Sequence, residues 1–300
     1  MAKILNASDL RSHLGGLIER TDYIQTNYKS RTTDEMVYRK TWKWAFKDQF
    51  MGAIFGEPSI RTRWSFTTAF ERLGGKVVSS FGPGSTSSEK GESLYDMIMT
   101  ASQMVEFLVI RQSEHLSTVD LSKVNCHIIN AGDGNNEHPT QALLDAYTIW
   151  REFKRFEDLK ILIIGDLRQS RAIHSLLRLL CNGNKFYLYD LRGCPDAGGW
   201  ETPNSEMLEG INRKELLPEV DVVYLNRAQL ERHKGEVNDF TFGLPEDLKY
   251  LSEKAIIMNP GPRREEMYRL ADEDPRCRYW QQVENGMYIR MALFHNILWE

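Results

Sequence analysis

The hydrophobic pattern of the chain predicts two successive series of strands and helices. Short apolar runs alternate with segments whose apolar residues recur at helical spacing. The predicted strands are Phe50–Phe55, Lys76–Phe81, Phe107–Arg111, Asn125–Gly132, Leu159–Asp166, Lys185–Asp190, Asp221–Asn226 and Ala255–Met258. Strands that alternate with helices favour mostly parallel sheets, so we expect an α/β fold of two doubly wound domains, each sheet being flanked by helices.

The charged segment Arg151–Asp158 separates the two series. We expect residues 1–149, closed by a C-terminal helix over 285–300, to form one domain and residues 150–284 to form the other. An N-terminal helix capped by Ser8 or Asp9 precedes the first strand.

The turn after the first strand, Ser59–Arg63, has the residues of an anion site. It lies where the strand leads into a helix that ends at Gly74–Gly75. Unpaired backbone N–H groups and the positive end of the helix dipole favour an anion there. The hydroxyls of Ser59 and Thr62 and the guanidinium of Arg61 add hydrogen-bond donors. Spacing alone gives equal weight to an ordinary N-cap beside solvated arginines.

Further candidates follow later strands of the first series. Lys90 belongs to a loop rich in Ser and Thr, where a merely solvated lysine is the commoner case. Arg111 ends a strand, and open α/β sheets place ligand contacts at the carboxyl ends of strands. His138 and Gln141 share one face of a helix that starts at Pro139. A lone histidine there is usually a cap or a surface residue.

The second series offers its own candidates. Arg171 follows a buried strand, in a turn that lacks the GxGxxG pattern, so no nicotinamide cofactor is expected. Arg227 and Gln229 point the same way if the chain stays extended after the strand 221–226. Asn259–Pro262 is a rigid turn that exposes its backbone.

Composition narrows the class of protein. The net charge of −4 argues against general nucleic-acid binding. No apolar run reaches the roughly 18 residues that span a membrane, and the N-terminus has no apolar core of a signal peptide. The four cysteines form no CxxC pair, so we expect neither disulfides nor a metal site, and a cytoplasmic protein.

Together these stretches resemble the aspartate/ornithine carbamoyltransferase family. Seven of them occur in the family's order and span nearly the whole chain. They are Ser59–Arg63, Lys90–Glu92, Arg111, His138–Gln141, Gly165–Asp166 with Arg171, Arg227–Gln229 and Pro260–Arg263. The aspartate branch fits better, because Arg171 and the Arg227/Gln229 pair match positions that hold the two carboxylates of aspartate. The Ser-Met-Gly and Cys-Leu-Pro sequences of the ornithine branch are absent.

The resemblance implies transfer of the carbamoyl group of carbamoyl phosphate to the amine of L-aspartate. The products would be N-carbamoyl-L-aspartate and phosphate, in de novo pyrimidine biosynthesis, with neither cofactor nor metal. The catalytic positions are matched by Arg61, Thr62, Lys90 and His138. The contacts to carbamoyl phosphate are matched by Ser59, Ile60, Arg61, Thr62, Thr86, Arg111, His138, Gln141, Gly261 and Pro262. The contacts to aspartate are matched by Lys90, Arg171, Arg227 and Gln229.

The resemblance also implies a homotrimer whose sites are completed by the Thr86–Lys90 loop of a neighbouring subunit. It leaves open whether a regulatory chain or a dihydroorotase partner binds. Four residues depart from the family pattern, namely Ile60, Thr86, Asn259 and Gly261. Two other readings therefore remain, a carbamoyltransferase for another amino acid and a non-catalytic scaffold relative.

Overall fold

The computed structural model describes residues 3–29, 42, 44–81, 91–230, 240–264 and 266–299. The chain divides into two compact units, one of residues 1–143 with 284–300 and one of residues 144–283. Two of the predicted site residues, Thr86 and Lys90, lie outside the described residues.

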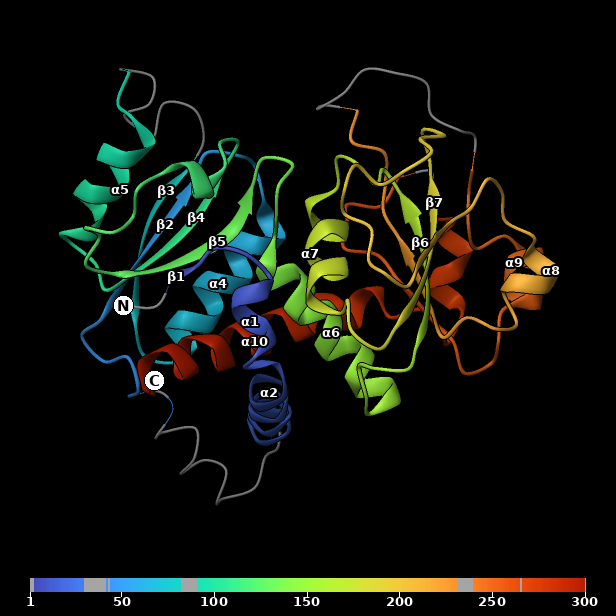
Figure 1. The fold of residues 1–300 in the computed structure, drawn as a ribbon. Coiled ribbons are helices and arrows are strands. Elements are labelled where there is room, and N and C mark those ends of the chain that lie inside the picture. Colours follow the sequence, from blue (N-terminus) through green and yellow to red (C-terminus); the bar gives the residue numbers. More distant parts are fainter. Residues whose placement is uncertain are drawn as a thin grey trace. The chain divides into compact units, whose positions relative to one another are not determined.

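The first unit contains a five-stranded sheet in the order β1-β5-β4-β2-β3, in which every pairing is parallel (Figure 1). Its strands are β1 (Lys3–Ile4), β2 (Phe50–Phe55), β3 (Lys76–Phe81), β4 (Phe107–Gln112) and β5 (His127–Asp133). The helices that begin in this unit are α1 (Ser8–Arg11), α2 (Leu14–Lys29), α4 (Ile60–Arg72), α5 (Leu94–Ser102) and α6 (Pro139–Phe153), with a 3-10 turn at Leu116–Thr118.

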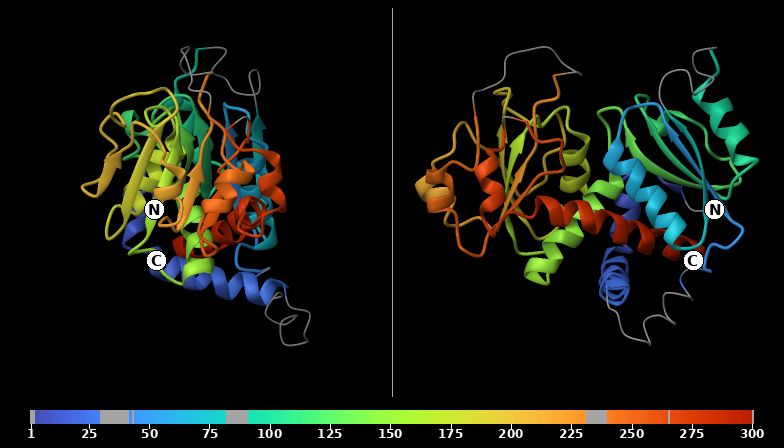
Figure 2. Two further views of the ribbon diagram at one scale, coloured as in Figure 1. Left: turned by 90° about the vertical axis from the view of Figure 1, so that its right-hand side faces the viewer. Right: turned by 180° about the vertical axis from the view of Figure 1, so that it is seen from behind.

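The second unit has a five-stranded parallel sheet in the order β10-β9-β6-β7-β8. Its strands are β6 (Lys160–Gly165), β7 (Lys185–Asp190), β8 (Ser205–Met207), β9 (Val222–Leu225) and β10 (Ile256–Met258). Its helices are α7 (Arg171–Leu179), α8 (Arg213–Leu216) and α9 (Pro245–Tyr250), and a 3-10 turn covers Arg269–Glu273. The last helix, α10 (Tyr279–Trp299), begins in this unit and ends in the first. Two parallel sheets flanked by helices confirm the predicted α/β class (Figure 2).

An aromatic cluster explains why most of α10, from residue 284 onward, belongs to the first unit. The ring of Phe294 on α10 lies 4.9 Å from that of Phe70, 5.6 Å from that of Phe107 and 5.9 Å from that of Phe66, measured between centroids. All four side chains are at most 1% exposed. Edge-on packing of this kind adds about 0.5–1.5 kcal/mol per pair to the burial of the rings. The cluster therefore ties α10 to α4 and β4.

Several element boundaries differ from the prediction. The two-residue strand β1 pairs with β5, and neither β1 nor β8 was predicted. The N-terminal helix is split into α1 and α2, and Ala7 rather than Ser8 or Asp9 occupies the N-cap position of α1. The Asp9 carboxylate instead accepts the backbone N–H groups of Leu5 and Asn6, at 2.8 and 3.0 Å. The C-terminal helix starts at Tyr279, not at Asn285.

Candidate active site

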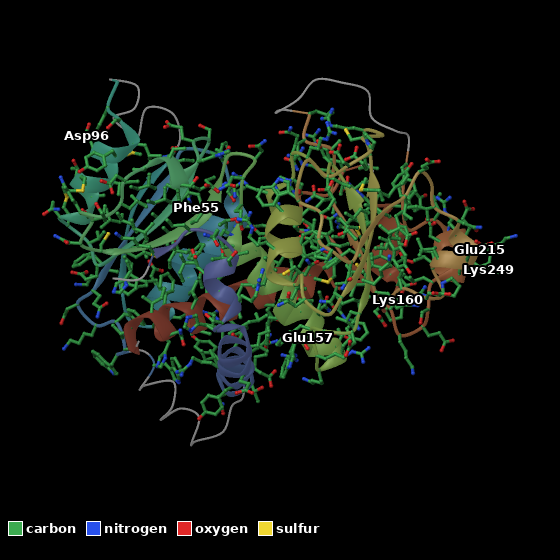
Figure 3. The ribbon with its side chains drawn as sticks, viewed as in Figure 1. Phe55, Asp96, Glu157, Lys160, Glu215 and Lys249 are labelled. Carbon is green, nitrogen blue, oxygen red and sulfur yellow. The ribbon has the colours of Figure 1, made fainter. Side chains whose placement is uncertain are left out.

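The topology of the first unit brings three predicted stretches to one edge of its sheet. Strands β2, β4 and β5 are neighbours and run parallel, with Phe55 opposite Arg111 and Gln112 opposite Asp133. Figure 3 locates Phe55, the last residue of β2. Because carboxyl ends of parallel strands share an edge, the turn after β2, Arg111 and the loop after β5 lie together there.

The predicted anion turn is the start of α4. Ser59 is the N-cap residue in an extended conformation, and its side chain makes no capping hydrogen bond. This geometry disfavours the ordinary capping role for the Ser59 hydroxyl. The first N–H groups of a helix have no partner within it, so α4 presents donors beside the exposed side chain of Arg61.

Thr62 and His138 meet at this helix start. The Oγ1 atom of Thr62 lies 3.5 Å from Nε2 of His138, and the two side chains are only 7% and 5% exposed. A contact of this length is at the limit of a hydrogen bond, as is common for catalytic groups before a substrate binds. Gln141, in the first turn of α6, which begins directly after His138, is also buried.

The loop before His138 is fixed by a carboxylate. Asp133 accepts hydrogen bonds from the side chain of Asn130 at 2.9 Å and from the backbone of Glu137 at 3.1 Å through Oδ1. Its Oδ2 accepts the N–H of Leu116 at 3.0 Å. Asp133 is 1% exposed, so these bonds form away from water and hold the loop that delivers His138.

Arg111 is half-buried at the end of β4. Its Nη1 donates to the carbonyl of Ala131 at 3.1 Å, and its Nε lies 3.5 Å from the Glu57 carboxylate. These two contacts orient the guanidinium at the edge that also carries Ser59 and His138.

Sequence reasoning missed Arg290, which joins the two helices of this site. It lies on α10, is 3% exposed and stacks over Phe66 at 4.6 Å. Its guanidinium donates to the Ser65 hydroxyl of α4 at 2.8 Å and to the Thr140 hydroxyl of α6 at 3.4 Å. Ser65 in turn donates to the carbonyl of Thr62 at 3.0 Å, so Arg290 helps to set the spacing between α4 and α6.

In the second unit, Arg171, Arg227 and Gln229 follow two neighbouring parallel strands, β6 and β9. Arg171 is the first residue of α7 and is 6% exposed. Arg227 and Gln229 are half-buried in a segment without regular secondary structure. The structure therefore places three of the four predicted aspartate contacts at one edge of this sheet.

Asp166 holds the segment that carries Gln229. Its Oδ2 accepts the backbone N–H of Gln229 at 3.0 Å and Nε of Arg192 at 2.8 Å. Asp166 is fully buried, so the pairing with Arg192 offsets the cost of burying its charge. Gln229 also donates from Nε2 to Asn226 at 3.2 Å.

An aromatic stack also fixes α7, the helix that begins at Arg171. One turn after Arg171, the His174 ring stacks on Trp200 with centroids 4.1 Å apart and an interplanar angle of 1°. Nε2 of His174 also lies 2.7 Å from the carbonyl of Leu167, which accepts its proton. The guanidinium of Arg178 also lies over the Trp200 ring, 4.7 Å from the ring centroid.

The predicted turn Asn259–Pro262 follows β10, the neighbour of β9. Gly261 has a φ of 67°, and the Gly261–Pro262 peptide is cis. Gly261 is half-buried and Pro262 exposed, so the backbone here is accessible.

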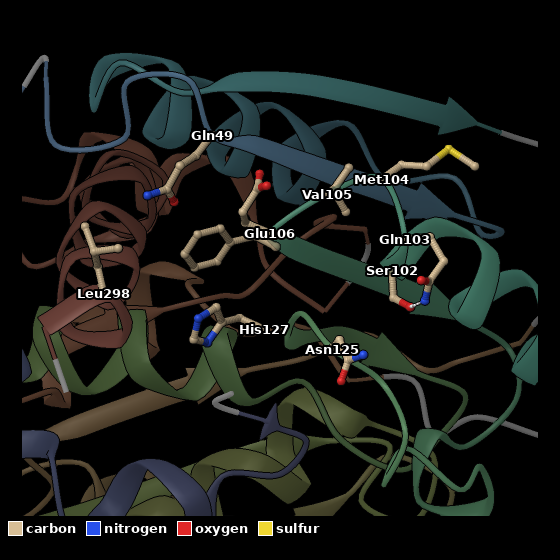
Figure 4. Close-up of a pocket in the computed structure, with 10 residues that line it drawn as sticks. Gln49, Ser102, Gln103, Met104, Val105, Glu106, Asn125, His127 and Leu298 are labelled. Atoms are coloured by element: carbon tan, nitrogen blue, oxygen red, sulfur yellow. Dashed lines mark hydrogen bonds between the residues drawn. The ribbon is translucent and has the colours of Figure 1, made fainter.

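A cavity of about 360 Å³ lies in the first unit, away from these residues (Figure 4). It opens at the amino-terminal ends of β2, β4 and β5, the edge opposite to the anion turn. Its lining includes Gln49, Glu106, Phe107, Asn125 and His127 and none of the predicted site residues. Burial lowers the pKa of His127, whose ring stacks on Phe107.

The described residues contain neither a metal-binding cluster nor a helix that could span a membrane. In the described ranges, His, Cys, Asp and Glu side chains do not gather in groups of three or more that could hold a metal ion. Every helix within these ranges falls short of the length or apolar character that crossing a membrane requires.

Comparison with known proteins agrees with this architecture. Residues 3–151 match the carbamoyl-P binding domain of aspartate/ornithine carbamoyltransferase, and residues 157–297 match the Asp/Orn binding domain. The aspartate carbamoyltransferase catalytic subunit of Pyrobaculum islandicum is 36% identical, with 98% of this chain and 97% of that protein covered. That of Staphylococcus saprophyticus is 40% identical, with 84% and 86% covered.

A solved structure is similar over almost the same length. Aspartate transcarbamoylase from Trypanosoma cruzi, in complex with carbamoyl aspartate and phosphate, superposes with a TM-score of 0.82 at 31% identity. The similarity covers 98% of this chain and 94% of that one. With both family domains matched in order and full-length relatives well above 30% identity, the chain belongs to the aspartate/ornithine carbamoyltransferase family.

Proposed function

We propose that this protein transfers the carbamoyl group of carbamoyl phosphate to the amine of L-aspartate, in pyrimidine biosynthesis. The amine attacks the carbonyl carbon, the new C–N bond forms, and the C–O bond to phosphate breaks. Phosphate leaves and takes the proton from the amine. No side chain acts as a nucleophile, so catalysis rests on positioning and on stabilising the tetrahedral oxyanion.

The observation that carries the proposal is the meeting of Thr62 and His138 at the start of α4. Thr62, His138 and Arg61 donate to the developing oxyanion, since all three belong to the edge where α4 presents its N–H groups. Ser59, Thr62, Arg111 and the backbone N–H of Ile60 bind the phosphate.

The second unit supplies the remaining contacts apart from Gln141, which belongs to the first unit. The side chains of Arg171, Arg227 and Gln229 bind the two carboxylates of aspartate, because guanidinium groups match a carboxylate with paired hydrogen bonds. The carbamoyl NH2 donates to Gln141 and to the backbone carbonyls of Gly261 and Pro262.

The active species is a cytoplasmic homotrimer in which Thr86 and Lys90 of one subunit complete the site of its neighbour. Lys90 contacts both substrates there. This part of the proposal rests on the resemblance of the Thr86–Lys90 loop to the loop that completes neighbouring sites in the family.

A colorimetric assay for carbamoyl-aspartate on the purified chain tests the activity. We expect turnover with L-aspartate that needs both substrates and no added metal. A panel of other amino acids, including ornithine, tests the choice of acceptor. Faster turnover with any of them than with aspartate would overturn the assignment of Arg171, Arg227 and Gln229.

A further inference from the structure

We propose that Asn259 is a positioning residue that aims the carbonyl oxygens of Gly261 and Pro262 at the carbamoyl NH2. It thereby makes the site selective for carbamoyl phosphate over acyl phosphates that lack this NH2 group. The inference rests on the proposed function, which assigns those two carbonyls to the carbamoyl group.

Asn259 is fully engaged in holding the turn that follows β10. It is 2% exposed, and its Oδ1 accepts the backbone N–H of Gly261 at 2.7 Å. Its Nδ2 donates to the Glu266 carboxylate at 3.0 Å, and its backbone N–H donates to Gln282 at 2.8 Å. The residue therefore connects the turn to two buried partners.

Glu266 fixes the far end of the same turn. It is 4% exposed, and its two carboxylate oxygens accept the backbone N–H of Arg264 at 3.2 and 3.0 Å. Hydrogen bonds to an ionised group are about twice as strong as neutral ones. Asn259 and Glu266 thus hold the backbone on both sides of Gly261 and Pro262.

A chain of buried hydrogen bonds anchors Asn259 to the body of the second unit. Gln282 donates to Oδ1 of Asp145 at 2.8 Å, and the Tyr224 hydroxyl donates to Oδ2 of Asp145 at 2.7 Å. Burial, and secondarily the charge of Asp145, raises the pKa of Tyr224 well above its usual value, so the hydroxyl keeps its proton. Asp145 and Tyr224 are fully buried, which makes the anchor rigid.

Gly261 is the link that needs such support. Its φ of 67° is in the left-handed region, which glycine enters freely and other residues enter with strain. The same freedom lets glycine leave this conformation at little cost. The bond from its N–H to Asn259 selects one conformation and with it the direction of the two carbonyl groups.

The test compares three ligands on wild type and Asn259→Ala. They are carbamoyl phosphate, acetyl phosphate, in which a methyl group replaces the NH2, and inorganic phosphate. We measure KM for carbamoyl phosphate and for aspartate, and Ki for the other two as competitors of carbamoyl phosphate. Wild type is expected to bind carbamoyl phosphate at least about tenfold more tightly than acetyl phosphate, because a buried acceptor left unpaired is costly.

In Asn259→Ala we expect KM for carbamoyl phosphate to rise about tenfold or more, because the carbonyl groups of Gly261 and Pro262 are no longer held in one orientation. Ki for acetyl phosphate and for phosphate should change by less than about threefold, so the preference for carbamoyl phosphate collapses. Asn259→Ser, whose hydroxyl can accept the Gly261 N–H in a weaker version of the same turn, should restore part of it. It also serves if the alanine variant does not fold.

Tyr224→Phe is the matched control. It removes a hydroxyl from the far end of the same network but keeps the bonds of Asp145 to Gln282 and of Asn259 to Gly261, so it should lower Tm with a much smaller effect on the ligand preference than Asn259→Ala. A preference that survives in both Asn259 variants, or an equal loss for all three ligands, would overturn the inference alone. A wild-type protein that does not distinguish carbamoyl from acetyl phosphate would instead overturn the assignment of the Gly261 and Pro262 carbonyls, and the inference with it.

Discussion

At the scale of single residues, the first unit concentrates donors at the edge where the proposed reaction would develop negative charge. The buried pair Thr62 and His138 lies beside the N–H groups of α4, while Arg61 is exposed. An exposed arginine at a helix start contributes little to the core, so its removal separates catalysis from stability.

Arg61→Ala is expected to lower kcat by at least two or three orders of magnitude. A donor to a developing oxyanion is typically worth about 3–4 kcal/mol in the transition state. Thermal unfolding should change little, since the side chain is exposed. Steady-state kinetics with a parallel Tm measurement checks both parts. Wild-type turnover in a folded variant would remove Arg61 from the proposed mechanism.

Arg227→Ala is expected to raise KM for aspartate far more than KM for carbamoyl phosphate, because the proposed contact is a carboxylate clamp. Two paired charged hydrogen bonds at about 1.5–3 kcal/mol each correspond to a rise of roughly a hundredfold or more. KM for each substrate is measured with the other saturating. Arg192→Lys is the matched control, because Arg192 contacts Asp166 and has no assigned substrate contact. Equal rises of both KM values in Arg227→Ala would contradict the assignment of Arg227 to a carboxylate of aspartate.

At the scale of secondary-structure elements, the sequence allowed the long strands to be predicted because their apolar runs are buried on both faces, as in Phe107–Ile110 of β4. It did not allow β1 or β8 to be predicted, because β1 has only two residues and β8, Ser-Glu-Met, contains no apolar run, unlike the equally short β10. Lys3 and Ile4 form a strand only because β5 lies beside them. The early start of α10 was missed for a similar reason, since its first turns are mostly exposed or polar.

Among the candidate site residues too, only those marked by a local sequence pattern could be predicted. The placement of the candidate residues at strand ends could be predicted from local spacing, because parallel strands bring their carboxyl ends together. Arg290 was not found, because its partner Ser65 is 225 positions away in the chain. The roles of Asp133 and Asn259 were missed as well, because their hydrogen bonds appear only once the loops are folded.

Arg290→Met tests how α10 ties α4 to α6. The variant keeps the bulk that packs on Phe66 but leaves the hydroxyls of Ser65 and Thr140 without this donor. We expect a loss of about 2–4 kcal/mol in unfolding free energy, from several buried hydrogen bonds, and a kcat reduced at least about tenfold. Denaturant unfolding and kinetics measure the two effects. Ser65→Ala, which removes one of these bonds, should have a smaller effect on both; equal effects would contradict the bridging role.

The contact between α2 and α10 predicts sensitivity to acid. His295 accepts a hydrogen bond from Arg20 at 2.7 Å, and its ring packs against that of Trp42 at an angle of 43°. Burial, with the charge of Arg20, lowers the pKa of His295 from 6.5 to about 4. Between about pH 4 and pH 6.5, His295 therefore binds a proton in the unfolded chain but not in the folded chain. The contribution of the neutral His295 to the free energy of unfolding is fully present above about pH 6.5, and it is lost as the pH falls toward 4.

After allowance for partial exposure, this loss is about 2 kcal/mol. Urea unfolding of wild type and of His295→Gln between pH 7 and about pH 4 measures it, and the variant should show a flatter dependence. His13→Gln, which changes an exposed histidine, should keep the wild-type slope. An unchanged slope in His295→Gln would remove His295 as the source of acid sensitivity.

At the scale of the whole molecule, each unit carries residues for part of the proposed chemistry. The proposed role of Lys90 depends in addition on a second subunit. In the proposed function Lys90 completes the site of a neighbouring subunit, and this arrangement requires an oligomer, most simply a closed trimer. On this view Lys90→Ala and Arg61→Ala lie in one site but on two different chains. Each variant should be nearly inactive as a homotrimer.

Mixing the two variants tests the shared site directly. Reversible dissociation and reassociation produces hybrids in which some sites receive a wild-type Lys90 from one chain and a wild-type Arg61 from its neighbour. Random mixing at equal ratio should restore roughly a quarter of wild-type activity, because each site draws independently from two chains. Native mass spectrometry verifies that hybrids formed, and each variant reassociated with itself is the control. If Lys90 served the site of its own chain, every site would lack either Lys90 or Arg61, and verified hybrids would stay inactive at every mixing ratio.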